Sequence, residues 1–310
     1  MIVVGGENLI DYVQSGTENG LPVYTAIPGG SCYNCALAAA RQGQPVAYAT
    51  PISNDTLGDL LANRLLADGV TLTQPRKTAP TSLAVVSVVA SIPSYQFYRQ
   101  RTAERLVNLD SIRNSVPAQT RIFHIGSLAL IDGADAQAWE DYFMQCGDLG
   151  ILTSLDPNAR PIVVQDRAPY VDRLMRMIKA ADILKLSDED LEYLLPDTDI
   201  DTAFAQICDI ARAGIIVLTR GSQGVRVFHN GTLFDVPSAV ANPLVDTVGA
   251  GDTFMGTLLA EINQLDVTTA HDLRTLDQQS VGAIISKAAI AAAKNCEHAG
   301  CNPPYLRDLQ

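Results

Sequence analysis

The sequence predicts an α/β protein with one doubly wound, mostly parallel sheet and helices on both of its faces. The chain has 310 residues, 47% of them hydrophobic and 18% charged, which is enough to bury a sizeable core in one large domain. Apolar β-type runs alternate with segments of helical periodicity through most of this length. Such alternation produces parallel strands joined by right-handed helical crossovers. We therefore expect residues 1–310 to form a single domain, with its ligands beyond the carboxyl ends of the strands.

Each element is expected where its pattern is clearest. Buried strands are expected at residues 2–5, 45–50, 121–126, 151–156, 182–186 and 215–219. Apolar residues recur every three or four positions in the segments expected as helices, which are 31–42, 56–67, 135–146, 170–180 and 202–213. Residues 225–229 and 232–236 are expected as a hairpin, because Asn230-Gly231 favours a two-residue turn. The apolar runs 255–262 and 281–293 are expected as further buried helices.

Two regions break the alternation, residues 9–28 and 81–100. Both contain strand-like residues with no helix between them, and the second includes the turn-like segment Ala90-Ser-Ile-Pro-Ser. We expect these regions to form a small antiparallel sheet that projects from the main body. An extension of the central sheet is the alternative. The exposed edge of the second hairpin leaves open a homodimer that pairs through this sheet.

The charge balance argues against several classes of partner. The chain has 22 Lys and Arg against 34 Asp and Glu, a net charge of −12, with no block of basic residues. It lacks the electrostatic footprint typical of proteins that bind nucleic acid or anionic membranes. Strand-like residues begin at once, which argues against a signal peptide, and the longest apolar stretch, 83–92, is too short to cross a bilayer. We expect a soluble, cytoplasmic protein.

The six cysteines are too sparse for a disulfide scaffold, and a cytoplasmic chain would keep them reduced. Cys32-x-x-Cys35 and Cys296-x-His298-x-x-Cys301 have the spacing of zinc ligands, but nothing in the sequence places the two segments together. The favoured interpretation is that these cysteines are small apolar side chains in a core.

The segment Asp246-Thr-Val-Gly-Ala-Gly-Asp-Thr-Phe254 carries the clearest chemistry. Gly249, Ala250 and Gly251 leave main-chain N–H groups unobstructed at the start of an apolar helix, where the helix dipole favours an anion. The segment is neither a Walker loop nor a dinucleotide fingerprint. Asp252 would repel a phosphate if binding were the only task, but it makes sense as a proton acceptor beside a phosphoryl group in transfer. The alternative is an N-cap aspartate.

Five other segments accompany this motif: Gly5-Gly-Glu-Asn-Leu-Ile-Asp11, Gly29-Gly30-Ser-Cys-Tyr-Asn34, Asp156-Pro-Asn-Ala-Arg160, Lys185-Leu-Ser-Asp-Glu-Asp190 and Thr219-Arg-Gly-Ser-Gln-Gly224. Together with Asp-Thr-x-Gly-Ala-Gly-Asp-Thr-Phe, they resemble the PfkB (ribokinase-like) family of ATP-dependent carbohydrate kinases over nearly the whole chain. The resemblance implies a ribokinase-like fold, ATP and Mg²⁺ as cofactors, and transfer of the ATP γ-phosphate to a hydroxymethyl group of a sugar.

The resemblance also implies roles for individual residues. Asp252 matches the family's catalytic base, and Gly249, Ala250 and Gly251 match the anion hole that stabilises the transferring phosphoryl group. The sugar ligands that it implies are Asp11, Gly29, Gly30, Asn34, Tyr98, Arg99, Asn158 and Arg160. The residues that it implies near ATP are Lys185, Ser187, Thr219, Gly221 and Gly224.

Metal sites are implied in the same way. Asp246 and the Val248 carbonyl match part of a monovalent-cation site beside the anion hole, which implies K⁺, and the Cys296–Cys301 turn would supply the rest. Near Mg²⁺ the chain departs from the family, because many relatives have Asn-x-x-Glu where this chain has Ser187-x-x-Asp190. The shorter Asp190 carboxylate would act on Mg²⁺ through water. The preceding Lys185 would contact either a phosphate or a carboxylate at the rim.

Phe97-Tyr98-Arg99, Thr102-Ala103-Glu104 and Asp156-Pro-Asn-x-Arg160 resemble the fructokinase and 2-keto-3-deoxygluconate kinase branches. Tyr98 would cover the sugar ring, and Arg99 and Arg160 would donate to its oxygens, unless they are surface charges. We expect phosphorylation of fructose to fructose 6-phosphate, with regions 9–28 and 81–100 as a lid that excludes water. The alternatives are a 2-keto-3-deoxygluconate kinase, a ribokinase, a nucleoside kinase or, in another class, a non-catalytic sugar-binding sensor.

Overall fold

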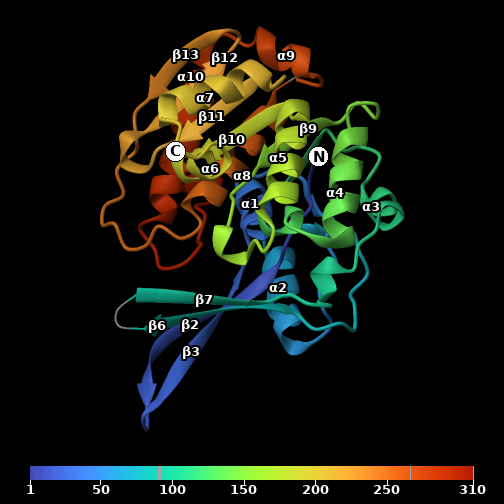
Figure 1. The fold of residues 1–310 in the computed structure, drawn as a ribbon, viewed down its shortest axis with the longest axis vertical. Helices are drawn as coiled ribbons and strands as arrows, with labels where there is room; N and C mark the ends of the chain where they lie inside the picture. Colours follow the sequence, from blue (N-terminus) through green and yellow to red (C-terminus); the bar gives the residue numbers. More distant parts are fainter. Residues whose placement is uncertain (90–91, 266, 310) are drawn as a thin grey trace.

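The computed structural model describes residues 1–89, 92–265 and 267–309, which form two sheets and their surrounding helices (Figure 1). The larger sheet has nine strands in the order β13-β12-β11-β10-β9-β8-β1-β4-β5. All neighbouring pairs from β11 to β5 are parallel, whereas β12 and β13 are antiparallel at one edge. The strands are β1 (Ile2–Val4), β4 (Val46–Tyr48), β5 (Thr71–Leu72), β8 (Ile122–Gly126), β9 (Leu152–Asp156), β10 (Ile183–Ser187), β11 (Ile215–Thr219), β12 (Val225–His229) and β13 (Thr232–Val236).

Helices cover both faces of this sheet (Figure 1). The α-helices are α1 (Ser31–Arg41), α2 (Thr56–Ala67), α3 (Leu109–Ser115), α4 (Gly133–Gln145), α5 (Arg167–Ala180), α6 (Asp188–Leu194), α7 (Ile200–Ile210), α8 (Ala250–Gln264), α9 (Ala270–Thr275) and α10 (Gln278–Asn295). Every predicted helix and every predicted strand of the large sheet is present, with ends within a few residues of the expected ones. No helix of the described residues is both long enough and apolar enough to span a bilayer.

Alternate residues of each central strand pack on opposite faces of the sheet. On β1, Ile2 and Val4 pack with α1, α2, α8 and α10, whereas Val3 packs with α4, α5 and α7. On β11, Ile215 and Ile216 divide between the faces in the same way. Strands that are buried on both faces are apolar at most positions, which is why they are recognisable in the sequence. The doubly wound sheet is confirmed.

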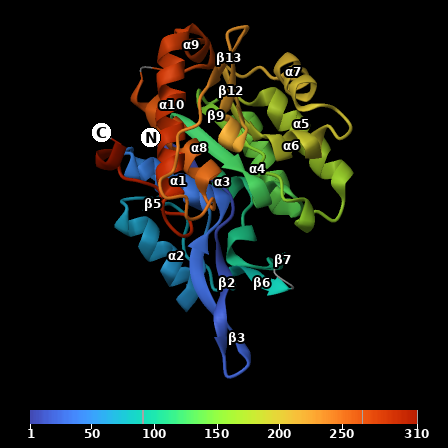
Figure 2. The ribbon, with the colours of Figure 1, turned by 90° about the vertical axis from the view of Figure 1, so that its left-hand side faces the viewer.

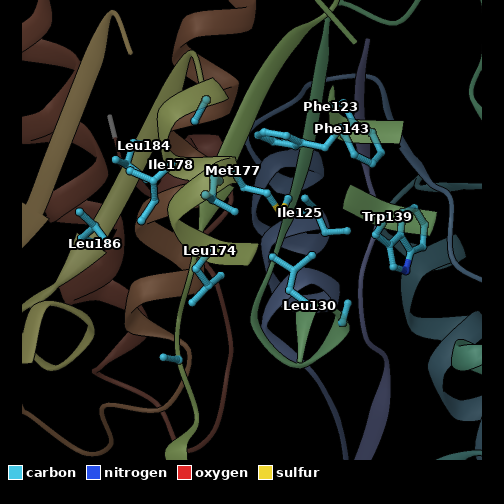
Figure 3. Close-up of a cluster of buried hydrophobic side chains, with 14 of the residues drawn as sticks. Phe123, Ile125, Leu130, Trp139, Phe143, Leu174, Met177, Ile178, Leu184 and Leu186 are labelled. Carbon is cyan, nitrogen blue, oxygen red and sulfur yellow. The ribbon is translucent and has the colours of Figure 1, made fainter. Parts of the chain in front are cut away.

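Aromatic side chains fill the layer between the sheet and α4 (Figure 3). Phe123 of β8 stacks on Trp139 of α4 with 6.1 Å between ring centroids, and it meets the Tyr142 ring edge-on at 4.9 Å. The same buried cluster continues through aliphatic side chains of α5 and β10, which are Leu174, Met177, Ile178, Leu184 and Leu186. This dense layer makes the sheet a rigid support for the residues at its carboxyl edge.

The smaller sheet has the order β3-β2-β6-β7 and extends away from the main body (Figures 1 and 2). Its strands are β2 (Leu9–Glu18), β3 (Leu21–Gly29), β6 (Ser82–Val89) and β7 (Ile92–Tyr98). Both hairpins are antiparallel as predicted, but β2 and β6 at the centre are parallel. The parallel pairing arises because the chain returns through α1, β4, α2 and β5 before it starts the second hairpin. Residues 90 and 91 of the predicted turn lie outside the described residues.

Helices α1 and α8 pack at unusually close range. A Cβ atom placed on Gly256 of α8 would lie 2.5 Å from the carbonyl oxygen of Cys35 and 2.6 Å from the Cβ of Ala38, both on α1. No side chain fits there without displacing one helix from the other. The lack of a side chain at Gly256 therefore sets the distance between the two helices.

We predict that Gly256→Ala lowers the free energy of unfolding by about 1–3 kcal/mol, because it overpacks this contact. The matched control is Gly282→Ala on α10, where the nearest atom to a new Cβ, in Phe234, is 3.9 Å away. The control should change stability by less than ~1 kcal/mol, in the stabilising direction, because alanine favours a helix over glycine. Urea unfolding measures both. Equal stabilities for the two variants would mean that α1 and α8 adjust freely.

Candidate active site

Asp252 lies where the N-terminal ends of α1 and α8 meet. Ser31 Oγ donates to Asp252 Oδ1 at 2.7 Å, and Asn34 Nδ2 donates to Oδ2 at 2.9 Å. Asn158 Nδ2, which follows β9, donates to Ser31 Oγ at 2.7 Å and lies 3.4 Å from Asp252 Oδ1. The N-cap of α8 is Gly249, and the Asp252 carboxylate binds side chains of other segments. Asp252 is thus not an N-cap residue, and that alternative is wrong.

The surroundings of Asp252 favour proton acceptance. Burial raises the pKa of its carboxyl above the usual value, although the hydrogen bonds from Asn34 and Ser31 act in the opposite direction. The negative charge of Asp156 raises the pKa further. A carboxylate of raised pKa is a stronger base, so it takes a proton from a hydroxyl group more readily.

The turn that precedes α8 has the features of an anion site. Gly249 has φ +76°, and a Cβ atom there would lie 2.4 Å from Cys301 Sγ, so only glycine fits. The first N–H groups of α8 have no acceptor within the helix, although that of Ala250 donates to the Thr247 carbonyl at 3.2 Å. The helix dipole favours a negative charge at this end. A Cβ on Gly251 would be 3.5 Å from Lys185 Nζ, so an ammonium group borders the same turn.

Lys185 is buried and forms an ion pair with Asp156, with 2.7 Å between Nζ and Oδ2. Burial alone would lower the pKa of Lys185, but the charges of Asp156, Asp190 and Asp252 raise it above the usual value. The ammonium group is therefore positively charged beneath the anion-binding turn. The sequence allows Lys185 to contact either a phosphate or a carboxylate at the rim. The structure contains a carboxylate contact, to Asp156, but it is buried and does not lie at the rim.

Ser187 and Asp190 form a capping box at the start of α6. Asp190 Oδ2 accepts the N–H and the hydroxyl of Ser187 at 2.8 and 2.9 Å, and Oδ1 accepts the N–H of Ala159 at 2.7 Å. Both carboxylate oxygens thus have donors, which does not fit a direct ligand of Mg²⁺. No group of three or more His, Cys, Asp or Glu within the described ranges could hold a metal ion.

Asp246 and Val248 lie in a loop that packs against the C-terminal turn. Asp246 Oδ1 accepts the N–H of Val248 at 3.0 Å, and Oδ2 accepts the N–H of Gly300 at 2.8 Å. The Val248 carbonyl accepts Asn295 Nδ2 at 2.8 Å. The loop and the turn of Cys296 to Cys301 thus meet as the family resemblance implies. Carboxylate and carbonyl oxygens are of the type that binds a monovalent cation, but these three oxygens accept hydrogen bonds in this structure, so a cation would have to share or replace those contacts.

Thr219, Gly221 and Gly224 follow β11, at the carboxyl edge of the sheet. Thr219 Oγ1 donates to the Leu186 carbonyl at 3.2 Å, which joins this loop to the end of β10. Gly224 has φ +86°, and a Cβ there would lie 2.5 Å from the Val236 carbonyl oxygen. The loop therefore lies on the same edge as Lys185, where the sequence predicts ATP.

The proposed sugar residues line the junction between the small sheet and α1. A Cβ on Gly29 would lie 2.4 Å from Asp11 Oδ2, so β2 and β3 place this carboxylate directly over the Gly29-Gly30 turn. Burial, and then the charge of Asp252, raise the pKa of Asp11 to about 6. Tyr98 at the end of β7 is 55% exposed, and Arg160 is exposed. These two side chains are available to a ligand.

Arg99 differs from the expectation of a sugar ligand. It is 7% exposed, and its Nε and Nη2 atoms donate to Glu104 at 2.9 and 3.1 Å. Its Nη1 atom donates to the Leu128 carbonyl at 3.0 Å. In this structure Arg99 forms a buried ion pair with the neighbouring Glu104 carboxylate. It is therefore neither a sugar ligand, as predicted, nor a surface charge, which was the alternative.

Two residues of the site were missed by reasoning from the sequence alone. Ser31 lies within the Gly29–Asn34 segment, but its hydroxyl was not recognised as the donor to Asp252. Glu7 accepts the N–H of Ser31 at 2.7 Å. The weak signal for both was the position of a glycine pair before a helix, since helix starts need acceptors for their free N–H groups.

A buried carboxylate of raised pKa in the first turn of a helix, with an ammonium group nearby, suits an enzyme that transfers a phosphoryl group to a hydroxyl. The family model described as "pfkB family carbohydrate kinase" matches residues 2–308. The chain belongs to this family and is a carbohydrate kinase.

Named relatives agree with the family. The chain is 31% identical to the fructokinase of Rhizobium leguminosarum bv. trifolii over 91% of its own length and 85% of the relative's. The crystal structure of the Xylella fastidiosa fructokinase with bound ATP superposes with a TM-score of 0.87 at 26% identity, covering 99% of this chain and 97% of the other. A double mutant of the Vibrio cholerae O395 fructokinase, with fructose, ADP and potassium ion bound, has the same fold, with a TM-score of 0.82, 24% identity and 97% and 93% coverage.

We predict that Asp11→Asn raises the melting temperature, and that this gain depends on pH. The charged form of Asp11 is disfavoured in the folded protein, whose pKa of about 6 exceeds the unfolded value. The resulting loss of stability is full above pH ~6, declines as the pH falls from ~6 to ~4, and vanishes below. Scanning calorimetry at pH 8, 6 and 4.5 should therefore find the largest gain at pH 8. Asp148→Asn, at an exposed loop position, should give no such trend. A gain that is independent of pH would contradict the buried charge.

Proposed function

We propose that the protein transfers the γ-phosphoryl group of ATP to the 6-hydroxymethyl group of fructose. The observation that carries this proposal is the Asp252 carboxylate, held by donors from α1 in the first turn of α8. The base and the anion-binding N–H groups thus share one helix turn. The fructokinase names of the relatives, including one at 31% identity, favour fructose as the acceptor. The intact base and its donors argue against a non-catalytic sugar sensor.

In this proposal, Asp252 accepts the proton of the sugar hydroxyl as the oxygen attacks the γ-phosphorus. The bond from phosphorus to the bridging oxygen of ADP breaks as the new bond forms. The N–H groups of Gly249, Ala250 and Gly251 would stabilise the charge on the phosphoryl oxygens, for which Ala250 would exchange its contact with the Thr247 carbonyl. Lys185 adds positive charge under the turn, and it would exchange part of its contact with Asp156 for a phosphate oxygen.

ATP would lie along the carboxyl edge of the sheet, against the loop of Thr219, Gly221 and Gly224. Mg²⁺ would enter with the nucleotide, because both oxygens of Asp190 already accept hydrogen bonds from the chain. Its contribution when bound is to neutralise phosphate charge. Ser187 would remain a capping residue near this edge. Because ATP is supplied in the cytoplasm, we place the reaction there.

The sugar would lie between α1 and the small sheet, with Asp11, Asn34, Asn158 and the Gly29-Gly30 backbone around its hydroxyl groups. Tyr98 and Arg160 would cover it from the exposed side. Residues 9–28 and 81–100 would act as a lid that keeps water from the phosphoryl group. β3 and β7 are the outer strands of the small sheet, and strand pairing at such an edge would form a homodimer through the lid.

We predict that Asp252→Asn lowers kcat for fructose by about 10²–10⁴-fold, the usual loss on removal of a general base. ATP binding should survive, since the substitution also removes a negative charge near the phosphates. Steady-state turnover with fructose, 2-keto-3-deoxygluconate, ribose and nucleosides measures both the base and the substrate. Preference for another acceptor would replace fructose in the proposal, and a kcat near that of the wild type would remove Asp252 from it.

We predict that K⁺ activates the enzyme several-fold over tetramethylammonium at equal ionic strength, because Asp246 and the Val248 carbonyl would hold the ion beside the anion hole. Asp246→Asn should abolish this difference. The Asp148→Asn variant, far from the loop in sequence and exposed, serves as the control and should keep full activation. Equal rates of the wild-type enzyme in both salts would exclude the cation site.

A further inference from the structure

Glu7 is a buried carboxylate at the junction of the two sheets, and the proposed function does not use it. It lies in the segment that joins β1 to β2, and it is 1% exposed. Its Oε1 atom accepts the N–H of Ser31 at 2.7 Å, whereas Oε2 has no hydrogen-bond partner among the residues that the structure describes. Burial raises the pKa of Glu7 to about 7. A buried carboxylate with one unsatisfied oxygen contributes little to stability. Its role is therefore sought in the segment that it holds in place.

Glu7 supplies the acceptor that the start of α1 lacks. The N-cap residue of α1 is Gly30, which has no side chain, and the first turn contains no acidic residue. A carboxylate near the first N–H groups satisfies one donor and also interacts favourably with the helix dipole. The two segments meet so closely that a Cβ on Gly30 would lie 2.7 Å from the Glu7 carbonyl oxygen.

The turn that Glu7 holds carries both close donors to Asp252. Ser31 Oγ and Asn34 Nδ2, at 2.7 and 2.9 Å, contact the two different oxygens of that carboxylate. A shift of the first turn of α1 would therefore rotate or release the Asp252 carboxylate. Small displacements of reacting groups are costly, because an error of about 1 Å can reduce rate by ~10²-fold.

Glu7 also faces the base of the lid. The charge of Arg99 is the largest influence that opposes the effect of burial on the pKa of Glu7. Arg99 follows β7 and is ion-paired with Glu104, and Ser82 at the start of β6 donates to the same Glu104 carboxylate at 2.9 Å. The start of β6 and the residue after β7 thus meet at the Arg99–Glu104 ion pair, and the Arg99 charge acts on Glu7.

We propose that Glu7 is a positioning residue: it holds the first turn of α1, and thereby the two donors that orient Asp252, against the base of the lid. Its effect on catalysis rests on the proposed function, in which Asp252 is the general base. The contact between Glu7 and Ser31 is independent of that function and is tested separately.

Glu7→Met removes the acceptor and the charge at similar length, whereas Glu7→Gln retains an acceptor. We expect kcat to fall by about 10–100-fold for Glu7→Met, and by a smaller factor for Glu7→Gln, with the KM for ATP unchanged. The matched control is Glu140→Met, which removes another buried and ion-paired carboxylate, between α4 and α5. That variant should lose stability but keep kcat. If Glu7→Met behaves like the control, the proposal is overturned.

A double-mutant cycle identifies the route of the effect. In the Asp252→Asn background, where no base remains to be oriented, Glu7→Met should lower the residual kcat by less than about 2-fold. An undiminished loss in that background would mean that Glu7 acts independently of Asp252 and would overturn the proposal. If Glu7→Met does not fold, the same cycle with Glu7→Gln tests the proposal. The several-fold loss of kcat that Glu7→Gln causes in the wild-type background should disappear in the Asp252→Asn background.

Hydrogen exchange of the free protein separates this inference from the proposed function. Amides 31–36 should exchange faster in Glu7→Met than in the wild type, while amides of α4 remain unchanged. Faster exchange, together with no turnover of any sugar by the wild-type protein, would support the Glu7 contact and refute the function. Unchanged exchange at 31–36 would refute the contact itself.

Discussion

The site depends on the close contact between α1 and α8. Asp252 is buried, and a buried carboxylate is costly unless donors meet it. Its closest donors, Ser31 and Asn34, lie on α1, so the distance between the helices decides whether they reach it. Gly256 lets the two backbones approach one another. A packing constraint in the interior of the fold thereby determines the geometry of the reacting groups at its edge.

The distribution of charge around the site explains how an acidic chain could bind a polyphosphate. The net charge is −12, and Asp11, Asp156, Asp190 and Asp252 all surround the site. A nucleotide would be repelled from most of this surface. The first turn of α8 and the Lys185 ammonium group are the positive features that we identify beside Asp252. A phosphate would therefore be stabilised mainly where Asp252 could act, and the acidic surroundings would help to select its position.

The sequence predicts well those elements that a single physical pattern determines. Strands buried on both faces, such as β11, are continuous apolar runs, and the Gly249–Asp252 turn follows from helix-start chemistry. The short helices α3, α6 and α9 escape periodicity analysis, because each spans only about two turns. The parallel pairing of β2 with β6 depends on the path of the chain between them, which no local pattern contains.

The environment of Arg99 could likewise not be predicted from a local sequence pattern, and it affects how a lid could close. The sequence places Arg99 beside Tyr98 at the end of a hairpin, but its burial depends on Glu104 and on the distant Leu128 carbonyl. A buried, bidentate ion pair holds its partners in one geometry. The base of the second hairpin is thus fixed to the main body, next to the Glu7 carboxylate. Closure over a sugar would then bend β6 and β7 beyond this ion pair, towards the free end of the sheet, while the first turn of α1 and Asp252 stay in place.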